Sequence, residues 1–398
     1  MSDSVTVVWD DVLTTYDFGP THPLRPVRLE LTIALARELG VLDAPNVRLA
    51  PPASATDDVI ELVHDPLYVS YVKKAPDELM SRIALRYGFG PGDNPLFPRM
   101  HESAALVTGA SVDAAQAVWE GASQHAVNIS GGLHHAMRDR ASGFCVYDDP
   151  AVAIAWLLAA GARRIAYVDV DVHHGDGVQA AFYDDPRVLT ISLHESGRTL
   201  FPGTGWPDEV GSGDGVGTSV NVALPAGTGD AGWLRAFTAV VPDLLRGYQP
   251  EIMLTQHGCD THERDPLAHL VCTVDGQGEA YRMLHALAHE VCGGRWVAVG
   301  GGGYDPVHVV PRAWTRVLAE AVGVPLRGAT PNSWREYAAR RTARRAPTSL
   351  SDGALEPWRP WEGGPGDGSR LDATVLATRQ AVFPAHGLDP YSAAGATP

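Results

Sequence analysis

Cysteine is scarce in this sequence, and the four that occur are scattered along 398 residues without a CxxC pair: Cys145, Cys259, Cys272 and Cys292. A disulfide framework is therefore not expected, and we expect the protein to be located in a reducing compartment. The first residues, MSDSVTVVWDDV, lack the basic and apolar segments of a signal peptide. Apolar stretches such as AVAIAWLLAAGA are too short to cross a bilayer. These absences predict a cytoplasmic protein without a membrane partner.

The sequence also lacks a block of basic residues. Its net charge of −16 is spread along the chain, which argues against a nucleic-acid-binding surface and slightly favours cationic partners. With 45% hydrophobic and 20% charged residues, the composition is ordinary for a soluble globular protein. The length suits one large α/β domain or two smaller ones. The oligomeric state is not indicated.

Short β-branched runs alternate with helical patterns from residue 125 onward. The alternation predicts an α/β fold in which a mostly parallel sheet is flanked by helices on both faces. Upstream, residues 25–40 predict a helix with Pro26 near its start and Gly40 after its end. The predicted strands are residues 125–130, 163–170, 187–195, 219–224, 251–256 and 295–301, and the later predicted helices are 149–160, 230–246, 277–292 and 308–322.

The composition changes near residue 324, where proline, glycine, arginine and tryptophan become frequent, as in GALEPWRPWEGGPGDGSR. The tryptophans argue against full disorder. We therefore expect one domain over residues 1–323 and a C-terminal extension, residues 324–398, that wraps around it.

Polar and glycine-rich motifs follow four of the predicted strands. They are GGLHHA (131–136), DVDVHHGDG (169–177), QHGCDTHERDP (256–266) and GGGGYDP (300–306). In an open parallel sheet, ligands bind outside the carboxyl ends of the strands. The fold is therefore expected to bring the four motifs together.

The motif DVDVHHGDG combines ligands suited to a metal ion. If the strand continues through it, Asp169, Asp171 and His173 share one face. Asp171 and His173, with Asp260 from the next motif, would make a catalytic site for zinc, although Fe(II) or Mn(II) could also use it. The alternative is that the aspartates cap the following helix and the histidines pack in the core.

Two further features are typical of proton transfer and of carbonyl polarisation. His134 and His135 are adjacent in a glycine-rich turn, where imidazoles held by carboxylates can move protons. Asp169 and Asp176 are available for that role, although a purely structural turn is the alternative. Tyr304 follows four glycines and can donate to a polarised carbonyl. The glycine run lacks the spacing of a phosphate-binding or dinucleotide-binding loop.

Six motifs in this order, GGLHHA, GFCVYDD, DVDVHHGDG, SLHE…FPGTG, GCD…DP and GGGGY, resemble the zinc-dependent histone deacetylase family. That family is built on the single-domain arginase–deacetylase α/β fold. THPLRPVR and GDNPLF also match, so the resemblance covers roughly residues 16 to 322. GCDTHERDPLAHL and the C-terminal tail look like the bacterial acetoin utilization (AcuC-like) branch.

The resemblance implies a role for particular residues. It implies that Asp171, His173 and Asp260 bind Zn²⁺, with Fe²⁺ as the alternative. It also implies that His134 and His135 are active-site histidines, with Asp169 and Asp176 as their carboxylate partners. Tyr304 would polarise the acetyl carbonyl. A structural K⁺ is implied on backbone carbonyls around Asp169, Asp171, His173, Ser192 and Leu193. The implied substrate contacts are Gly143, Phe144, Phe201, Leu267 and Gly302 along an acyl-lysine tunnel, Asp93 at its rim, and Arg28 in an inner cavity.

Three positions depart from the family pattern. Leu133 stands where an aromatic residue is usual, Asp149 where asparagine is common, and THER (261–264) where a small, glycine-containing stretch is expected. The last puts the tunnel entrance in question. No departure removes a metal ligand or the tyrosine.

The resemblance implies hydrolysis of Nε-acetyl-lysine on a protein substrate, with acetyl-CoA synthetase as a candidate. In that reaction His135 transfers protons and His134 is an electrostatic partner. Three alternatives stay open: deacetylation of small amines such as acetylpolyamines, an arginase-like hydrolase with two manganese ions, and an inactive binder of acyl-lysine.

Overall fold

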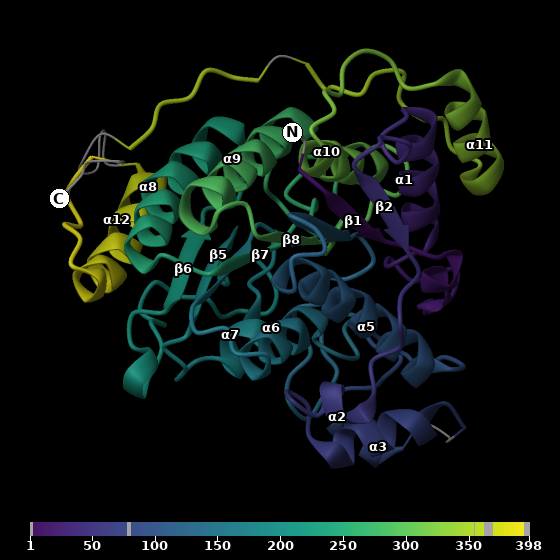
Figure 1. Ribbon diagram of the computed structural model, residues 1–398, viewed down its shortest axis with the longest axis horizontal. Helices are drawn as coiled ribbons and strands as arrows, with labels where there is room; N and C mark the ends of the chain where they lie inside the picture. Colours follow the sequence, from purple (N-terminus) through teal and green to yellow (C-terminus); the bar gives the residue numbers. More distant parts are fainter. Residues whose placement is uncertain (1–2, 78–80, 354, 362–368, 394–398) are drawn as a thin grey trace.

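The computed structural model describes residues 3–77, 81–353, 355–361 and 369–393. Eight strands form one sheet in the order β2-β1-β3-β8-β7-β4-β5-β6, and every neighbouring pair is parallel (Figure 1). This confirms the predicted α/β class. The strands are β1 Val5–Val8, β2 Val47–Ala50, β3 His125–Asn128, β4 Ile165–Asp169, β5 Val188–Glu195, β6 Ser219–Leu224, β7 Ile252–Gln256 and β8 Trp296–Val299.

The six predicted strands, 125–130 through 295–301, all occur, each trimmed by at most two residues at an end. The sequence analysis missed β1 and β2, which have four residues each. β2 lies at the edge of the sheet and is partly exposed, so its sequence VRLA has neither the length nor the apolar content of a central strand.

Helices cover both faces of the sheet (Figure 1). Both ends of α9 are explained by local sequence, because the Thr273 side chain accepts from Gly276 N and Gly293 ends the helix with φ +62°. One face carries α1 Val27–Glu38, α8 Asp230–Tyr248, α9 Val274–Cys292 and α10 Val310–Val322, and the other carries α5 Met100–Trp119, α6 Asp149–Ala159 and α7 Asp176–Ala181. The shorter helices α2 Asp57–Ile60, α3 Pro66–Lys74 and α4 Arg82–Arg86 lie in the segment before α5.

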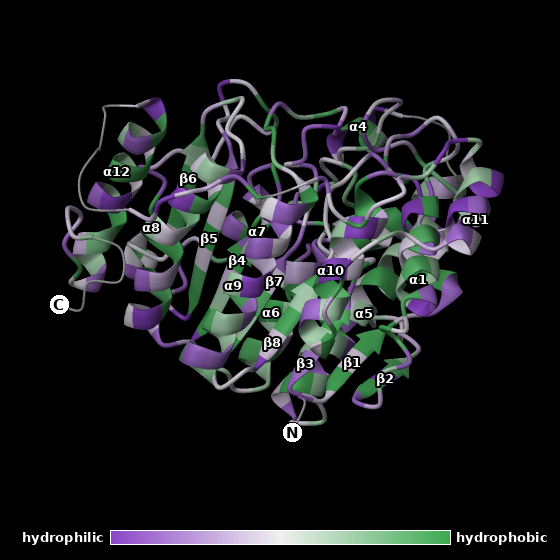
Figure 2. Ribbon diagram, turned by 90° about the horizontal axis from the view of Figure 1, so that it is seen from above, coloured by the Kyte–Doolittle hydropathy of each residue, from purple (hydrophilic) through white to green (hydrophobic). Residues whose placement is uncertain are grey.

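The core lies between the sheet and these two helical layers. Strands β1 and β3 to β8 are buried along their whole length, and Figure 2 shows apolar residues concentrated in the strands. Strands covered on both faces need no regular polar alternation, and Val, Ile, Leu and Ala make up more than half of the residues in these segments. Among the described residues, no helix has both the length and the apolar character needed to span a membrane.

The segment after residue 323 makes specific contacts with the rest of the chain. Helix α11 (Asn332–Thr342) lies beside α1, where Trp334 Nε1 donates to Leu31 O at 2.9 Å. Helix α12 (Arg370–Val382) lies beside α8 at the opposite end of the sheet, and Thr378 donates to Asn221 O of β6 at 2.6 Å. Figure 1 shows the two helices on opposite sides of the molecule.

Candidate active site

The four motifs meet at one edge of the sheet, as the strand directions require. All strands are parallel, so the loops after β3, β4, β7 and β8 leave the sheet on the same side. Figure 2 shows loops gathered along this edge, opposite the N-terminus. The carboxyl ends of adjacent strands therefore supply the candidate site.

Asp171, His173 and Asp260 form a buried cluster at this edge. His173 Nδ1 lies 3.0 Å from Asp171 Oδ1 and 3.1 Å from Asp260 Oδ2, and the three ligand atoms lie within 4.8 Å of one another. Two carboxylates and one imidazole that converge with so little access to water could hold a metal ion between them. Two oxygens and one nitrogen leave a fourth position open, which is the donor set of a catalytic zinc site.

Neighbouring groups fix the orientation of these ligands. Gln256 Nε2 and Gly302 N both donate to Asp171 Oδ2 at 2.8 Å, and Val172 N donates to Asp260 Oδ1 at 3.0 Å. A Cβ atom at Gly302 would lie 2.0 Å from Asp260 Oδ2. A side chain at that glycine is therefore excluded by the carboxylate it packs against.

The strand-face interpretation of DVDVHHGDG was wrong in detail. Strand β4 ends at Asp169, so Asp171 and His173 lie in the loop and do not share a strand face with it. The capping alternative does not hold either, because α7 begins at Asp176 after Gly175, which makes no side-chain cap. The loop, rather than strand alternation, directs the two ligands toward Asp260.

His134 and His135 are each held by a carboxylate. His134 Nδ1 donates to Asp169 Oδ2 at 2.7 Å, and His135 Nδ1 donates to Asp176 Oδ1 at 2.7 Å. The two Nε2 atoms lie 3.1 Å apart. Tyr167 also donates to Asp169 Oδ2 at 2.7 Å. Both imidazoles thus have a fixed tautomer and a fixed ring orientation.

The two histidines have opposite electrostatic surroundings. Burial disfavours the charge on His134, but Asp169 and Asp171 outweigh it and raise its pKa to about 10. Burial and then the neighbouring His134 lower the pKa of His135 to about 4, against the opposing effect of Asp176. His134 is therefore the more basic of the two imidazoles.

Tyr304 lies beside the same pocket. Its backbone N–H donates to Asp265 Oδ2 at 2.8 Å, and its ring meets Phe144 edge-on at 5.6 Å between centroids. Burial raises the pKa of the Tyr304 phenol well above its usual value, so it remains a hydrogen-bond donor at neutral pH. The pocket is lined by Leu24, Gly132, Leu133, His134, His135, Gly143, Phe144, Cys145, Asp171, Gly301, Gly302 and Tyr304.

Of the expected substrate contacts, Gly143, Phe144 and Gly302 line this pocket, and Phe201 lies next to it. Phe201 is 43% exposed and its ring lies 5.0 Å from that of His135, a position suited to the mouth of a tunnel. Gly143 has φ +49°, and a Cβ there would lie 2.4 Å from the His135 ring. This wall residue is therefore in direct contact with a candidate catalytic histidine.

Leu267, Asp93 and Arg28 lie outside the pocket lining. Leu267 N donates to Asp265 Oδ1 at 2.9 Å, so it shares a carboxylate with Tyr304. Asp93 is exposed, and its backbone oxygen accepts from His22 Nε2 at 3.1 Å. Arg28 is buried and donates to Gly301 O at 2.7 Å and Gly303 O at 3.2 Å. In this structure Arg28 supports the backbone of the glycine run.

Of the residues expected to hold potassium, Asp169, Ser192 and Leu193 lie on neighbouring strands, and Asp171 and His173 lie in the loop after β4. Asp169 of β4 is the register partner of Ser192 of β5, and Leu193 follows it. The structure thus places these backbones side by side, while K⁺ itself stays a prediction.

Two of the departures from the family pattern have clear structural roles. The side chain of Asp149 accepts from Gly132 N at 3.0 Å and Leu133 N at 2.8 Å, so it fixes the turn before the two histidines. In THER, His262 donates to Asp352 at 2.8 Å and is buried, whereas Glu263 and Arg264 are exposed. His262 therefore connects this stretch to the C-terminal segment.

Sequence reasoning missed three supporting residues: Gln256, Asp149 and Asp265. Gln256 also donates to Gly132 O at 3.1 Å, so one amide links the candidate metal ligands to the turn that carries the two histidines. A polar residue at the end of an apolar strand was a usable signal for Gln256. Asp149 and Asp265 act on backbone N–H groups of distant loops, and local patterns carry no sign of such contacts.

Comparisons with known proteins agree with this geometry. A model of the Histone deacetylase domain matches residues 22–321. The acetoin utilization protein AcuC of Bacillus subtilis (strain 168) is 42% identical over 355 residues, covering 89% of this chain and 91% of that protein. AcuC of Staphylococcus aureus (strain MSSA476) is 36% identical over 357 residues, covering 88% and 91%.

Solved structures show the same fold. The crystal structure of an HDAC homologue complexed with SAHA aligns with a TM-score of 0.81 and 29% identity, covering 95% of this chain and all (100%) of that one. An HDAC homologue from Aquifex aeolicus aligns with a TM-score of 0.80 and 28% identity, covering 94% and 100%.

Proposed function

The chain belongs to the histone deacetylase family, and we propose that it is a zinc-dependent enzyme that hydrolyses Nε-acetyl-lysine side chains of proteins. Its fold is the single-domain arginase–deacetylase type. One observation carries the proposal: the carboxylate-held histidines, Tyr304 and the ligand Asp171 all line one buried pocket. A nucleophile, a proton carrier and an oxyanion donor can therefore reach the same carbonyl.

Asp171, His173 and Asp260 are proposed to hold the metal, with Zn²⁺ preferred and Fe²⁺ as the alternative. Their buried, converging ligand atoms and the glycine that packs on Asp260 support this assignment. A bound divalent ion would polarise the acetyl carbonyl and lower the pKa of a water molecule.

His135 is proposed as the group that moves protons. It takes the proton of the attacking water and returns it to the nitrogen of the departing lysine. Asp176, 2.7 Å from His135 Nδ1, leaves Nε2 as the atom that exchanges the proton. His134, held by Asp169, is proposed to stabilise charge nearby.

Tyr304 is proposed to donate to the oxygen that becomes negative in the tetrahedral intermediate. The opposite wall, formed by Gly143 and Phe144, suits the methylene chain of a lysine. We further propose that Phe201 and Leu267 contact this chain and that Asp93 binds the substrate backbone. A structural K⁺ on the carbonyls around Asp169 and Ser192, and a cytoplasmic location suited to four free buried thiols, complete the proposal.

The substrate class can be tested by comparing kcat/KM for an acetyl-lysine peptide and for acetylspermidine. The proposal predicts that the peptide is the better substrate. A higher value for acetylspermidine would instead assign the enzyme to small acetylated amines, for which the exposed Asp93 would provide a contact for the second cation.

Acetyl-CoA synthetase is proposed as the protein substrate, on the similarity to acetoin utilization proteins. If the proposal holds, incubation with the zinc-loaded enzyme restores the activity of acetylated synthetase. The His135→Ala variant serves as the control. A synthetase that stays acetylated while the peptide is hydrolysed would exclude this substrate and leave the deacetylase activity in place.

A further inference from the structure

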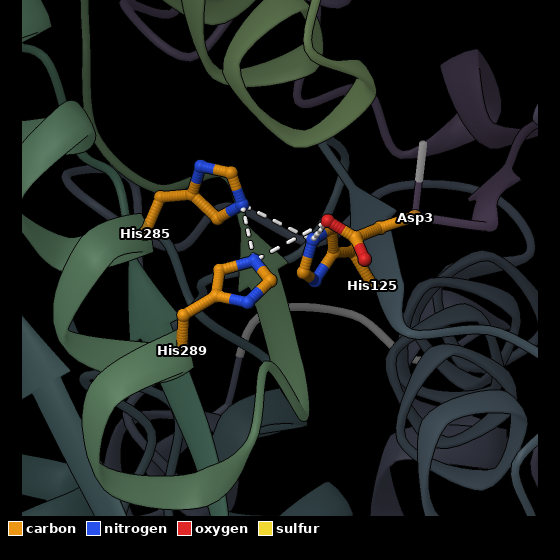
Figure 3. A group of neighbouring side chains, drawn as sticks. All are labelled: Asp3, His125, His285 and His289. Carbon is orange, nitrogen blue, oxygen red and sulfur yellow. Dashed lines mark hydrogen bonds and ion pairs between the residues drawn. The ribbon is translucent and has the colours of Figure 1, made fainter. Parts of the chain in front are cut away.

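A second cluster of metal-binding side chains lies at the opposite edge of the sheet. Asp3 precedes β1, His125 begins β3, and His285 and His289 lie one turn apart on α9. Figure 3 shows the four side chains pointing toward a common centre. The group is distinct from the active site, which lies at the carboxyl ends of the strands.

The distances between the ligand atoms suit a tetrahedral ion. His285 Nε2 lies 3.0 Å from His289 Nε2 and 3.1 Å from His125 Nε2. Asp3 Oδ2 lies 3.4 Å from His289 Nε2 and 3.5 Å from His125 Nε2. Zinc bound at about 2.0–2.1 Å holds tetrahedral nitrogen and oxygen ligands about 3.3 Å apart. The four observed separations lie on both sides of this value, so a small adjustment of these side chains would allow them to coordinate one ion.

Hydrogen bonds at Nδ1 leave the Nε2 lone pairs of His125 and His285 facing each other. His125 Nδ1 donates to Gly294 O at 2.9 Å, and His285 Nδ1 donates to Glu320 Oε1 at 3.0 Å. The neutral form of each ring then carries no proton on Nε2. Two such nitrogens 3.1 Å apart repel unless a proton or a cation lies between them.

The side chain of His125 is fully buried, whereas those of His285 and His289 lie nearer to solvent. His289 is 39% exposed, so an ion can enter from solvent. The groups that accept from the two Nδ1 atoms are a backbone carbonyl (Gly294) and a carboxylate (Glu320). These are the usual outer partners of metal-bound histidines.

The backbone around the cluster is held in place by other contacts. Ser4 O accepts from Gln124 N at 2.9 Å and from His125 N at 3.1 Å, and Asp3 O accepts from Asn46 at 2.7 Å. The Trp296 ring stacks on His285 at 5.1 Å. Three separate elements therefore present their ligands without depending on the ion.

We propose that Asp3, His125, His285 and His289 bind a structural Zn²⁺ ion. The four side chains fill a tetrahedral shell, whereas the active site supplies three ligands and an open position. The ion would tie the segment before β1 and the start of β3 to the C-terminal half of α9. Three nitrogens and one oxygen select a borderline ion such as zinc over magnesium or calcium.

Metal analysis of the untagged, full-length protein tests this proposal. After zinc loading and dialysis, the wild type should hold two zinc ions per chain, and His289→Ala and His285→Ala should each hold one. His386→Ala is the matched control, because this histidine lies outside both clusters, and it should keep two. The His289→Ala variant should retain deacetylase activity, since the exposed side chain is remote from the active site. One ion in the wild type, or two in both cluster variants, would overturn the proposal.

Cobalt spectroscopy provides a readout that is independent of activity and of the active-site ion. A chain with Asp171→Ala and His173→Ala should still bind one Co²⁺ and show the visible absorption of tetrahedral cobalt, and adding His289→Ala should abolish it. Replacing the outer partner, Glu320→Ala, should weaken binding about 10–100-fold. Absence of the tetrahedral spectrum in the Asp171→Ala and His173→Ala chain would contradict a closed four-ligand site.

Discussion

Gln256 Nε2 donates to Asp171 Oδ2 at 2.8 Å, joining the end of β7 to the loop after β4. The same amide donates to Gly132 O in the turn before the histidines. A single side chain therefore links the proposed metal ligand Asp171 to the turn that carries the proposed proton-transfer pair.

Gln256→Leu should weaken zinc binding at the active site about 10–100-fold, because the ligand Asp171 loses an outer hydrogen bond. Competition with a coloured chelator measures the dissociation constant. Gln380→Leu, a change at an exposed glutamine that contacts Tyr391, is the control and should have no effect. Equal affinity in both variants would mean that the backbone N–H groups of Gly302 and His173 are sufficient to orient Asp171.

Asp176→Asn should lower kcat by about 10²–10⁴, the range for loss of a positioned acid–base group. The neutral amide no longer stabilises the imidazolium that forms when His135 takes a proton. His135→Ala should lose a similar factor, and the double variant should lose no more than His135→Ala alone, because the two residues act as a unit. Additive losses would show that Asp176 acts elsewhere.

Tyr304→Phe should lower kcat by about 10²–10³, since one oxyanion donor is lost while the ring remains. Binding of the acetylated peptide should weaken much less, because a neutral carbonyl needs the donor less than an oxyanion does. The measurements are kcat, peptide affinity and metal content on one preparation. A variant with wild-type kcat would assign Tyr304 a structural role, and loss of metal would show that its hydroxyl helps to hold the metal site together.

The site residues that could be predicted from the sequence are those that follow the end of a predicted strand. Asp171, His173, His134 and Tyr304 follow apolar runs, and a parallel sheet brings such positions together. The prediction that Asp171 and His173 come together was correct, but the strand geometry used to reach it was not, because both residues lie in the loop after β4. Strand alternation gave the correct grouping for the wrong local reason.

The missed features depend on tertiary contacts. Strands β1 and β2 precede the region in which strand and helix patterns alternate, and β2 is partly exposed at the edge of the sheet. Asp149 and Asp265 were quoted within motifs, but their roles come from backbone N–H groups of other loops. The cluster with His125 and His289 joins residues that are far apart in the sequence, and only the folded chain shows it.

Asp352→Ala should destabilise the protein at neutral pH by about 1–3 kcal/mol, because Arg312, which is 2% exposed, loses its partner at 2.7 Å. Burial alone would raise the pKa of Asp352, but hydrogen bonds from His262 and Val274 N and the charge of Arg312 hold it well below the usual value. The exposed Asp214→Ala is the control.

The pH dependence of this effect has a definite sign. A carboxylate whose pKa is depressed in the folded state contributes stability above its unfolded pKa of about 3.9 and loses it as the pH falls. Denaturant unfolding should therefore show a large difference between wild type and Asp352→Ala at pH 7 and a smaller one near pH 3. A difference that grows on acidification would contradict the ion pair.

The central claim is that Asp171, His173 and Asp260 hold the metal used for deacetylation. The most direct measurement is loss of the acetyl group from an acetyl-lysine peptide, followed by mass spectrometry, with metal-free and zinc-loaded protein and with His173→Ala. The account predicts turnover only in the zinc-loaded wild type, restored by added zinc after chelation. Equal turnover by metal-free wild type, or by His173→Ala, would contradict it.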